Sequence, residues 1–322
     1  MSRGPAVSQS DAAIGVLLLT FGSAVTSADV PAYLRSVRGG REPSAELVTE
    51  FQRRFDAIGR SPLIDITAAQ AEALQSMLAV RHTDSAVRVS VGMLHSEPRV
   101  ADSLRALVAD GVTRVIAIVL APQYSPLILA GYERTLSAAA DAAGPTVTVR
   151  TAGAWHLTPS WIASLSERVD DSLREVNAEA GAGLAVVFTA HSLPRPVVER
   201  DPGYMVQIDE TIAAVARRVG LDAGQWTFAF QSAGHTPEEW LEPDLTEVLA
   251  AIRDSGSTDV LVVPVQFVAD HLETLYDIDV AAAEQARAAG LRFHRITMPN
   301  TDPHFIAALV EVVEREMAAV QV

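Results

Sequence analysis

Residues 188–194 read FTAHSLP, and residues 260–279 read VLVVPVQFVADHLETLYDID. Each stretch is an apolar, strand-like run that leads into a loop. The first loop begins at His191, and the second delivers His271 and Glu273 together. Chemistry in open α/β sheets collects at the carboxyl ends of the strands. We therefore expect two strands to direct an imidazole and a carboxylate at one crevice.

Outward from these stretches, short apolar runs alternate with longer segments of helical period, which is typical of a parallel sheet wrapped by helices. Unbroken hydrophobicity in VIAIVLA (115–121) and LVVPVQF (261–267) predicts strands buried on both faces. We expect strands near 15–21, 87–93, 115–121, 147–151, 184–190, 226–231, 259–265 and 292–297. We expect helices near 28–37, 43–58, 66–81, 98–110, 128–143, 158–177, 205–219, 243–254, 273–289 and 303–320.

The strands divide four and four, which predicts two similar doubly wound α/β domains with a shared cleft between them. The length of 322 residues suits two domains. We place the first domain at residues 13–155 and the second at 156–322. The C-terminal helix is a candidate to pack back on the first domain.

Composition excludes several functional classes. The net charge is −15 and no basic run is present, which argues against nucleic acid as a partner. All 25 basic residues are arginine, so Schiff-base chemistry and a P-loop lysine are excluded. Without cysteine there is no thiolate nucleophile, disulfide or cysteine-bound iron–sulfur cluster. The apolar runs are shorter than the ~18 residues of a transmembrane segment, so we expect a cytoplasmic protein.

Two residues of the second stretch could act together. On a helix that starts near His271, Glu273 and Asp277 are four residues apart and share one face. Like charges so placed repel unless a cation lies between them, whereas the alternative is a solvated acidic first turn favoured by the helix dipole. His191 is either a hydrogen-bonded structural group or a ligand or base that works near pH 7.

The opposite wall of the crevice is predicted from residues 17–40, LLLTFGSAVTSADVPAYLRSVRGG. Gly22 and Ser23 follow the first strand and allow a ligand close to the backbone. Arg38 and Arg41 offer planar forks for carboxylates, although surface arginines are usually solvated.

A second cationic point comes from residues 53–63, RRFDAIGRSPL, in which Arg54 and Ser61 flank an apolar stretch. Tyr132 and Trp240 are candidates to line the pocket, with burial in the core as the alternative. The sequence lacks the glycine-rich dinucleotide motif, the nucleophile elbow and the zincin motif. Dehydrogenase, α/β-hydrolase and zincin activities are therefore not indicated.

An ordered set of motifs resembles the ferrochelatase family, most closely the coproporphyrin ferrochelatases of Gram-positive bacteria. The set covers nearly the whole chain, and its most specific members are AHSLP, QSAGHTPEEWL and FVADHLETLYDID. The motifs are LLLTFGSA (17–24), YLRSVRGGREP (33–43), RFDAIGRSPL (54–63), TAAQAEAL (67–74), APQYS (121–125), FTAHSLP (188–194), FQSAGHTPEEWLEP (230–243) and VPVQFVADHLETLYDID (263–279).

The resemblance implies two Rossmann-like domains of chelatase type, each a four-stranded parallel sheet flanked by helices. It implies insertion of Fe2+ into coproporphyrin III to give coprohaem in haem biosynthesis. The catalytic and metal-binding pair falls on His191 and Glu273, with Asp277 as a relay. The family's substrate-binding positions fall on Phe21, Arg38, Arg54, Phe55, Ser61 and Tyr132. Trp240, the pocket candidate named above, completes the predicted substrate contacts.

The sequence departs from the family pattern at three points. Relatives often carry tyrosine at the position of Phe21, and phenylalanine has no oxygen to reach the iron of the product. The outward line of carboxylates stops after Asp277, because the next helical position is Ala281. Some members bind a [2Fe-2S] cluster through cysteines, which this chain lacks, so we expect no cofactor beyond the substrate Fe2+.

Alternatives to coproporphyrin III remain open at this stage. They are protoporphyrin IX as the substrate, a cobalt or nickel chelatase acting on another tetrapyrrole, and a non-catalytic tetrapyrrole carrier. The expected partners are coproporphyrin III and Fe2+. We expect a monomer that makes a transient contact with a coprohaem decarboxylase.

Overall fold

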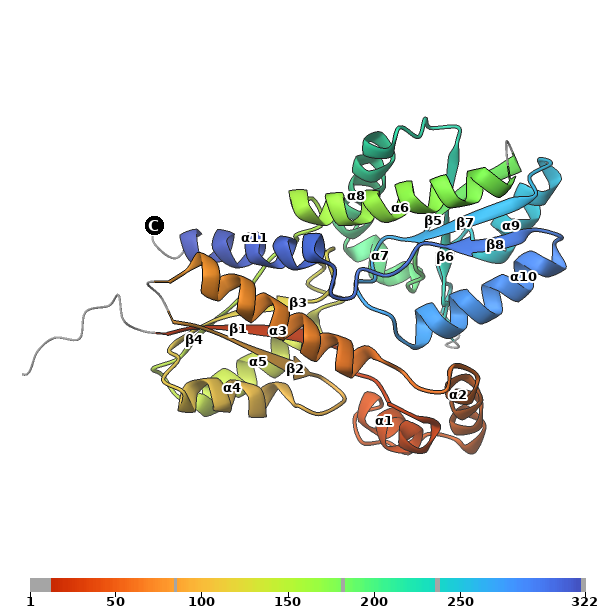
Figure 1. The fold of residues 1–322 in the computed structure, drawn as a ribbon. Coiled ribbons are helices and arrows are strands. Elements are labelled where there is room, and N and C mark those ends of the chain that lie inside the picture. The colour runs from red at the N-terminus through yellow and green to blue at the C-terminus, as the bar shows by residue number, and fades with distance from the viewer. Residues whose placement is uncertain (1–12, 84–85, 181–182, 235–237, 320–322) are drawn as a thin grey trace, which may run out of the picture.

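The computed structural model describes residues 13–83, 86–180, 183–234 and 238–319. These residues form two four-stranded sheets, and every neighbouring pair of strands is parallel (Figure 1). All eight predicted strands are confirmed, and with them the fold class. The strands are β1 (Ile14–Thr20), β2 (Val87–Met93), β3 (Arg114–Val119), β4 (Thr148–Thr151), β5 (Leu184–His191), β6 (Trp226–Gln231), β7 (Asp259–Pro264) and β8 (Arg292–Arg295).

Both sheets have the same strand order, β2-β1-β3-β4 in the first and β6-β5-β7-β8 in the second. β1 and β5 are therefore equivalent strands, as are β3 and β7. The helical elements of the described chain are η1 (Ser27–Asp29), α1 (Val30–Val37), α2 (Ala45–Ile58), α3 (Leu63–Arg81), α4 (Val100–Ala109), α5 (Ala130–Ala143), α6 (Pro159–Ala180), α7 (Arg195–Arg200), α8 (Gly203–Val219), α9 (Leu245–Asp254), η3 (Glu273–Ala282), α10 (Ala283–Ala288) and α11 (Pro303–Ala319).

Two helical elements differ from the prediction. The short helix α7 was not expected, because a six-residue segment opened by prolines gives no clear helical period. The predicted helix 273–289 is present, but its first ten residues form the π-helix η3 before the chain continues as α10. Short π-helical segments are uncommon and are frequent at functional sites.

The central strands are buried on both faces. In β1, Val16 and Leu18 belong to one hydrophobic cluster, and Leu17 and Leu19 belong to another on the opposite face. Alternate residues of a strand point to opposite faces, so helices must cover both sides of the sheet. This confirms the reading of the unbroken apolar runs.

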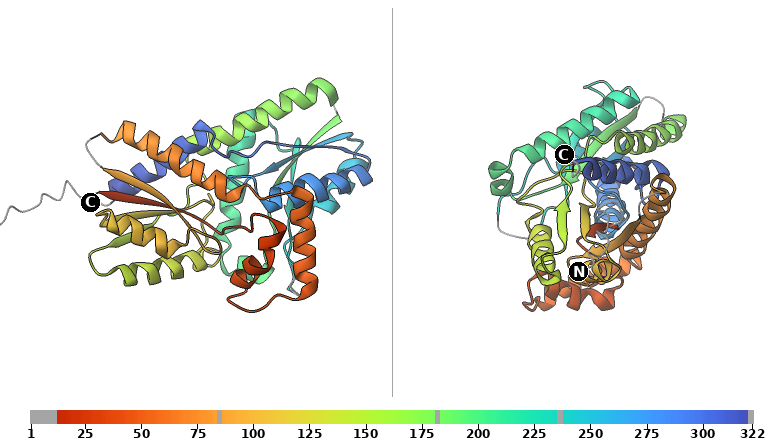
Figure 2. Two further views of the ribbon diagram at one scale, coloured as in Figure 1. Left: turned by 60° about the horizontal axis from the view of Figure 1, so that its bottom comes forward. Right: turned by 90° about the vertical axis from the view of Figure 1, so that its left-hand side faces the viewer.

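The helix α11 ties the two halves together. It follows β8 of the second sheet, yet it packs against α3 of the first half and against α6 (Figures 1 and 2). Arg81 at the end of α3 pairs with Glu314 of α11, Nε to Oε1, at 2.9 Å. One hydrophobic cluster contains residues of both sheets and of these helices. The division of the chain at residues 155 and 156 stays a prediction.

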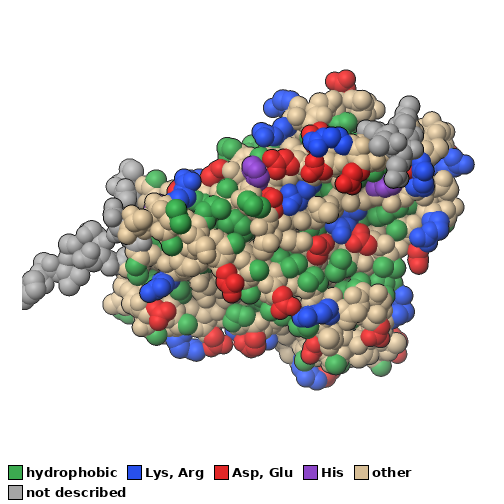
Figure 3. Space-filling view, viewed as in Figure 1, with side chains coloured by type: hydrophobic (Ala, Val, Ile, Leu, Met, Phe, Trp, Pro, Cys, Tyr) green, Lys and Arg blue, Asp and Glu red, His purple; other side chains and the backbone are tan. Residues whose placement is uncertain are grey.

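Acidic and basic side chains alternate over the face shown in Figure 3, with no basic patch on that face. In the described part of the chain, no helix is both long enough and apolar enough to span a membrane.

Candidate active site

His191 is the last residue of β5, so its position is fixed by the sheet. In the strand register it lies opposite Gln231 of β6. Its backbone N–H donates to Oε1 of Gln266, which follows β7, at 2.6 Å. Contacts to both neighbouring strands therefore hold the imidazole at the carboxyl edge of the sheet.

Glu273 reaches the same edge from the loop after β7, as the first residue of η3. The loop is held by Thr274, which is fully buried. Its hydroxyl oxygen accepts from the His271 N–H at 2.8 Å and donates to the His271 carbonyl at 3.0 Å. The expectation that two strand ends direct an imidazole and a carboxylate into one crevice is met.

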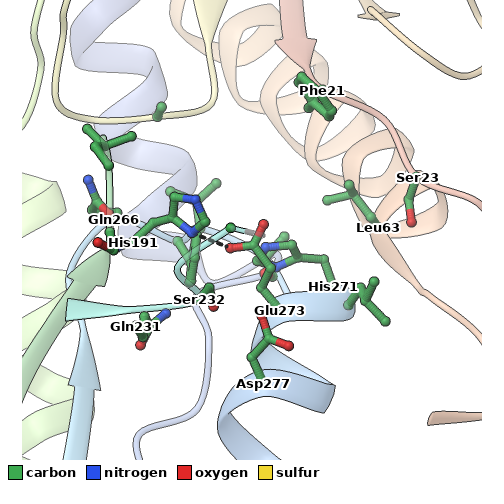
Figure 4. A pocket seen from close by; sticks show the side chains of 18 of the residues that line it. Phe21, Ser23, Leu63, His191, Gln231, Ser232, Gln266, His271, Glu273 and Asp277 are labelled. Atoms are coloured by element: carbon green, nitrogen blue, oxygen red, sulfur yellow. Dashed lines mark hydrogen bonds and ion pairs between the residues drawn. The ribbon is translucent and has the colours of Figure 1, made fainter. Parts of the chain in front are cut away.

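The two side chains form a close pair, drawn as a dashed line in Figure 4. His191 Nδ1 lies 3.0 Å from Glu273 Oε2, and the side chains are 33% and 34% exposed. Both atoms are buried, and neither makes a hydrogen bond with the described residues, so their contact is an ion pair. The side chains as a whole are about one third exposed although the two facing atoms are buried.

Burial and mutual attraction act in opposite directions on this pair. Burial, the largest single influence on His191, lowers the pKa of the imidazole, but Glu273 and, to a smaller extent, Asp277 together more than offset it, so the pKa is raised above its ordinary value. Burial raises the pKa of Glu273, whereas His191, His271 and Arg54 together lower it to about 2. The carboxylate is thus ionised at neutral pH and stabilises a positive charge beside it.

Asp277 lies one turn further along η3 and has a cation beside it. Arg54 Nη1 of α2 is 3.3 Å from Asp277 Oδ1, and Arg54 Nε is 2.9 Å from Glu50 Oε1. Burial is the main cause that raises the pKa of Asp277 above its ordinary value. Since Glu273 and Asp277 carry like charges, Arg54 supplies the nearby cation that the sequence pattern requires.

A cavity of about 840 Å3 lies between the carboxyl ends of the two sheets, a volume within the usual range of about 300–1,000 Å3 for ligand sites. His191, Glu273 and Asp277 line one wall, and the residues from the first half that line it include Phe21, Arg54, Phe55 and Tyr132. Seven of the predicted site residues are therefore brought together around one space.

Small residues and aromatic rings form the wall contributed by the first half. Gly22 has φ +86°, and a Cβ there would lie 2.6 Å from Ser96 Oγ, so any other residue at this position would be strained and would clash with Ser96. Ser23 N–H donates to the same hydroxyl at 2.8 Å. Phe21 is 44% exposed, with its ring centroid 4.5 Å from that of His95. In Figure 4 its ring lies across the cavity from His191.

Three predicted substrate contacts lie outside the cavity lining. Arg38 is exposed at the end of α1. Ser61 is buried, and its backbone N–H donates to the Val25 carbonyl at 2.9 Å. Trp240 is half-buried, and its indole covers Gly234, where an added Cβ would lie 2.6 Å from the ring. Residues 235–237 of the motif FQSAGHTPEEWLEP lie outside the described residues.

Other lining residues were not predicted. Thr67 and Gln70 of α3 are buried and line the cavity. Thr67 and Gln70 follow Leu63 by four and seven residues, so they lie on the same face of the helix as this apolar residue. Polar residues on an otherwise apolar face could have indicated a cavity there. His271, which was expected at the crevice together with Glu273, does line the cavity, and its Nδ1 lies 3.0 Å from the Ala269 carbonyl. Its ring therefore donates through Nδ1 to that carbonyl.

Two facing side chains of the site could ligate a metal ion. The described residues hold no group of three or more His, Asp or Glu side chains arranged to enclose a metal. His191 and Glu273 would give an ion two side-chain ligands, leaving its other positions to water or to a substrate. Imidazole and carboxylate both ligate Fe2+.

Solved structures with a similar fold match this chain at low sequence identity. SirB from Bacillus subtilis, solved with Fe3+, gives a TM-score of 0.59 at 15% identity and covers 94% of each chain. CbiX, described as the terminal enzyme of sirohaem biosynthesis in denitrifying bacteria, gives 0.52 at 15% identity, covering 94% of this chain and 98% of its own. These likenesses show the fold alone.

Sequence relatives are closer. A protein of Deinococcus radiodurans named ferrochelatase is 36% identical over 95% of this chain and 97% of its own length. A coproporphyrin III ferrochelatase of Geobacillus thermodenitrificans is 35% identical over 95% and 96%. The profile of the ferrochelatase family matches residues 13–317. The match spans both sheets and the cavity between them, and the chain therefore belongs to the ferrochelatase family.

Proposed function

We propose that this protein inserts Fe2+ into coproporphyrin III and releases coprohaem. The observation that carries the proposal is the pair of His191 Nδ1 and Glu273 Oε2, 3.0 Å apart on one wall of a cavity of about 840 Å3. The opposite wall is aromatic and uncharged around Phe21. A flat macrocycle would lie between these walls with one face toward the pair.

The reaction has two requirements that this pair meets. Two protons must leave the pyrrole nitrogens, and Fe2+ must lose its water ligands as it takes their place. Imidazole and carboxylate can each accept a proton, and each can ligate Fe2+. The ionised Glu273 attracts the cation, and His191 stands beside it as base or ligand. Asp277, one turn outward, extends the same charged face and relays ions or protons.

Binding energy elsewhere on the macrocycle would assist the chemistry. A flat porphyrin directs its nitrogen lone pairs inward, whereas a bent ring presents them on one face. Contacts that favour the bent ring stabilise the transition state relative to the free substrate. We assign these contacts to the aromatic wall around Phe21 and Tyr132, with the fully buried Phe55 supporting it from behind. Burial raises the pKa of the Tyr132 phenol, which keeps that wall neutral.

The preference for coproporphyrin is supported by the arginine at the cavity. Coproporphyrin carries four propionates and protoporphyrin two, so cations near the ring edge favour the former. Among the described lining residues, Arg54 is the single arginine. Several relatives at about 35% identity, from Geobacillus species, are named coproporphyrin III ferrochelatases. A propionate that reaches Arg54 would compete with Asp277 for the guanidinium.

The test is a substrate panel with the purified protein. Coproporphyrin III, protoporphyrin IX and sirohydrochlorin are each assayed with Fe2+, Co2+ and Zn2+ under anaerobic conditions. We expect the highest kcat/KM for Fe2+ with coproporphyrin III. A higher value with protoporphyrin IX, or with Co2+ and sirohydrochlorin, contradicts the proposal. Tight porphyrin binding with no insertion would identify a carrier.

A further inference from the structure

Arg295, the last residue of β8, lies behind the wall that carries Glu273 and outside the cavity lining. Its side chain is only 12% exposed. Nε and Nη2 pair with the two carboxylate oxygens of Asp279 at 2.6 and 2.8 Å. Nη2 also reaches Asp270 Oδ1 at 3.3 Å, and Nη1 donates to the Ile296 carbonyl at 2.9 Å. Every nitrogen of the guanidinium is engaged.

The two carboxylates that Arg295 holds are placed on either side of the site. Asp270 precedes Glu273 by three residues, and Asp279 follows it by six. Between them lie His271, Glu273 and Asp277, the ionisable groups that this segment contributes to the cavity. Arg295 therefore clamps both ends of the segment, and it does so with a bidentate fork, which fixes direction as well as distance.

Asp270 is fixed on its other side by Asn300. Asn300 Nδ2 donates to Asp270 Oδ2 at 2.8 Å, and the Asp270 N–H donates to Asn300 Oδ1 at 2.9 Å. The Asn300 carbonyl in turn accepts from Nε2 of Gln70, a buried residue of α3, at 2.8 Å. The clamp is thus anchored to the helix that lines the cavity from the other half of the molecule.

The clamped segment is one that needs external support. η3 is a π-helix, and such helices are rare because their backbone geometry is less favourable than that of the α-helix. Relaxation to an α-helix would rotate Glu273 relative to Asp277 and change its distance from His191. The donors of Arg295 go to Asp270, Asp279 and Ile296, so its influence on Glu273 must pass through the backbone that these groups hold.

We propose that Arg295 is a positioning residue that maintains the π-helical turn of η3 and so keeps Glu273 opposed to His191. The inference rests on the proposed function, because it concerns the same pair. Replacing a group that orients the ligands of a metal site typically lowers activity or metal affinity by about 10- to 100-fold. Porphyrin affinity should be insensitive to Arg295, which lies outside the cavity lining.

The test compares Arg295→Lys with Arg292→Lys. Arg292 is at the start of β8, and its contacts include Oδ2 of Asp259 in β7 at 2.8 Å. The control therefore alters another arginine of β8 that pairs with an aspartate, at the end of the strand away from the site. We expect Arg295→Lys to lower kcat for Fe2+ insertion about 10- to 100-fold. The Kd for porphyrin, from fluorescence quenching, should change by less than about twofold, and Arg292→Lys should leave both near wild type.

A second variant and a second readout make the test independent of folding and of turnover. Asp279→Asn keeps Arg295 but weakens the fork, and should lower kcat in the same direction. The side-chain 15N shifts of His191 report the neighbouring carboxylate without any reaction. In Arg295→Lys they should move toward those of Glu273→Gln. If the wild type inserts no iron, the proposed function fails while the shifts still test the clamp.

Three outcomes overturn the inference. The first is wild-type kcat and unchanged His191 shifts in Arg295→Lys. The second is an equal loss of kcat in Arg295→Lys and Arg292→Lys with equal losses in thermal stability, which marks a general structural role. The third is a parallel loss of porphyrin affinity and kcat in Arg295→Lys.

Discussion

The carboxyl ends of β1 and β5 occupy equivalent places in the two sheets but carry different chemistry. β1 ends at Thr20 and passes into Phe21 and Gly22, whereas β5 ends in His191. The strand beside β5 leads into Glu273, while the strand beside β1 leads into neutral residues at Leu120 and Ala121. A repeated topology has thus been used asymmetrically.

This difference indicates a division of labour across the cavity. The second half supplies the groups that can bind an ion or move a proton. The first half supplies rings, small residues and one arginine, which can hold a macrocycle and its carboxylates. Similar folds therefore need not contribute similar functions, since function depends on the side chains at the strand ends.

The largest expected effect comes from removing the imidazole. His191→Ala should lower kcat for Fe2+ insertion by about 100-fold or more, because it removes a base or ligand at the reacting centre. Porphyrin Kd, measured by fluorescence quenching, should change by less than about twofold. The comparison variant Phe21→Ala, on the other half, should instead weaken porphyrin binding. Equal losses of kcat in both variants, with porphyrin affinity unchanged in both, would show that binding and catalysis are not divided between the two halves.

The next effect concerns the charge of the pair. In Glu273→Gln the carboxylate that raises the pKa of His191 is gone, while burial, which lowers it, remains. The pKa of His191 should therefore fall, and the neutral imidazole should persist to lower pH than in the wild type. Ring 15N titration by NMR measures this directly. If the pKa of His191 were unchanged or raised in the variant, Glu273 would not be its electrostatic partner.

The smallest of the three effects tests the first half. Arg54→Ala should weaken coproporphyrin III about tenfold, the loss expected for a hydrogen bond to a charged group. Dipropionate protoporphyrin IX should be weakened less. Arg60→Ala is the control, because Arg60 is an exposed arginine that pairs with Asp65 Oδ2 at 2.6 Å outside the cavity lining. Equal weakening of both porphyrins argues against a contact between Arg54 and a propionate.

The sheets were predictable from sequence because their signal is local. Unbroken apolar runs identify buried parallel strands wherever they occur, and all eight were found within about three residues of their bounds. His191, Glu273 and Asp277 were predictable for a related reason. Strand ends of a parallel sheet meet at one edge, so their neighbours along the chain are brought together by topology alone.

Side-chain direction and helix type were less accessible. Arg38 and Arg54 both precede glycine-containing loops in arginine-rich motifs, yet only Arg54 faces the cavity, because α2 packs against η3 while the end of α1 lies in solvent. Arg295 of β8 contacts Asp279 of η3 from 16 residues further along the chain, and no hydrophobic period indicates this contact or the π-helical form of η3. Trp240 covers Gly234 across a loop, a contact that no periodicity reveals.

The return of α11 to the first half has a mechanical consequence. A hinge motion that opened the cleft would have to separate Arg81 from Glu314 and Arg150 from Glu316, which are paired at 2.9 and 2.8 Å. It would also have to expose the buried face that α11 shares with α3. The packing of α11 against α3 therefore opposes a hinge motion of the two halves, because opening the cleft by such a motion would expose apolar surface that is now buried.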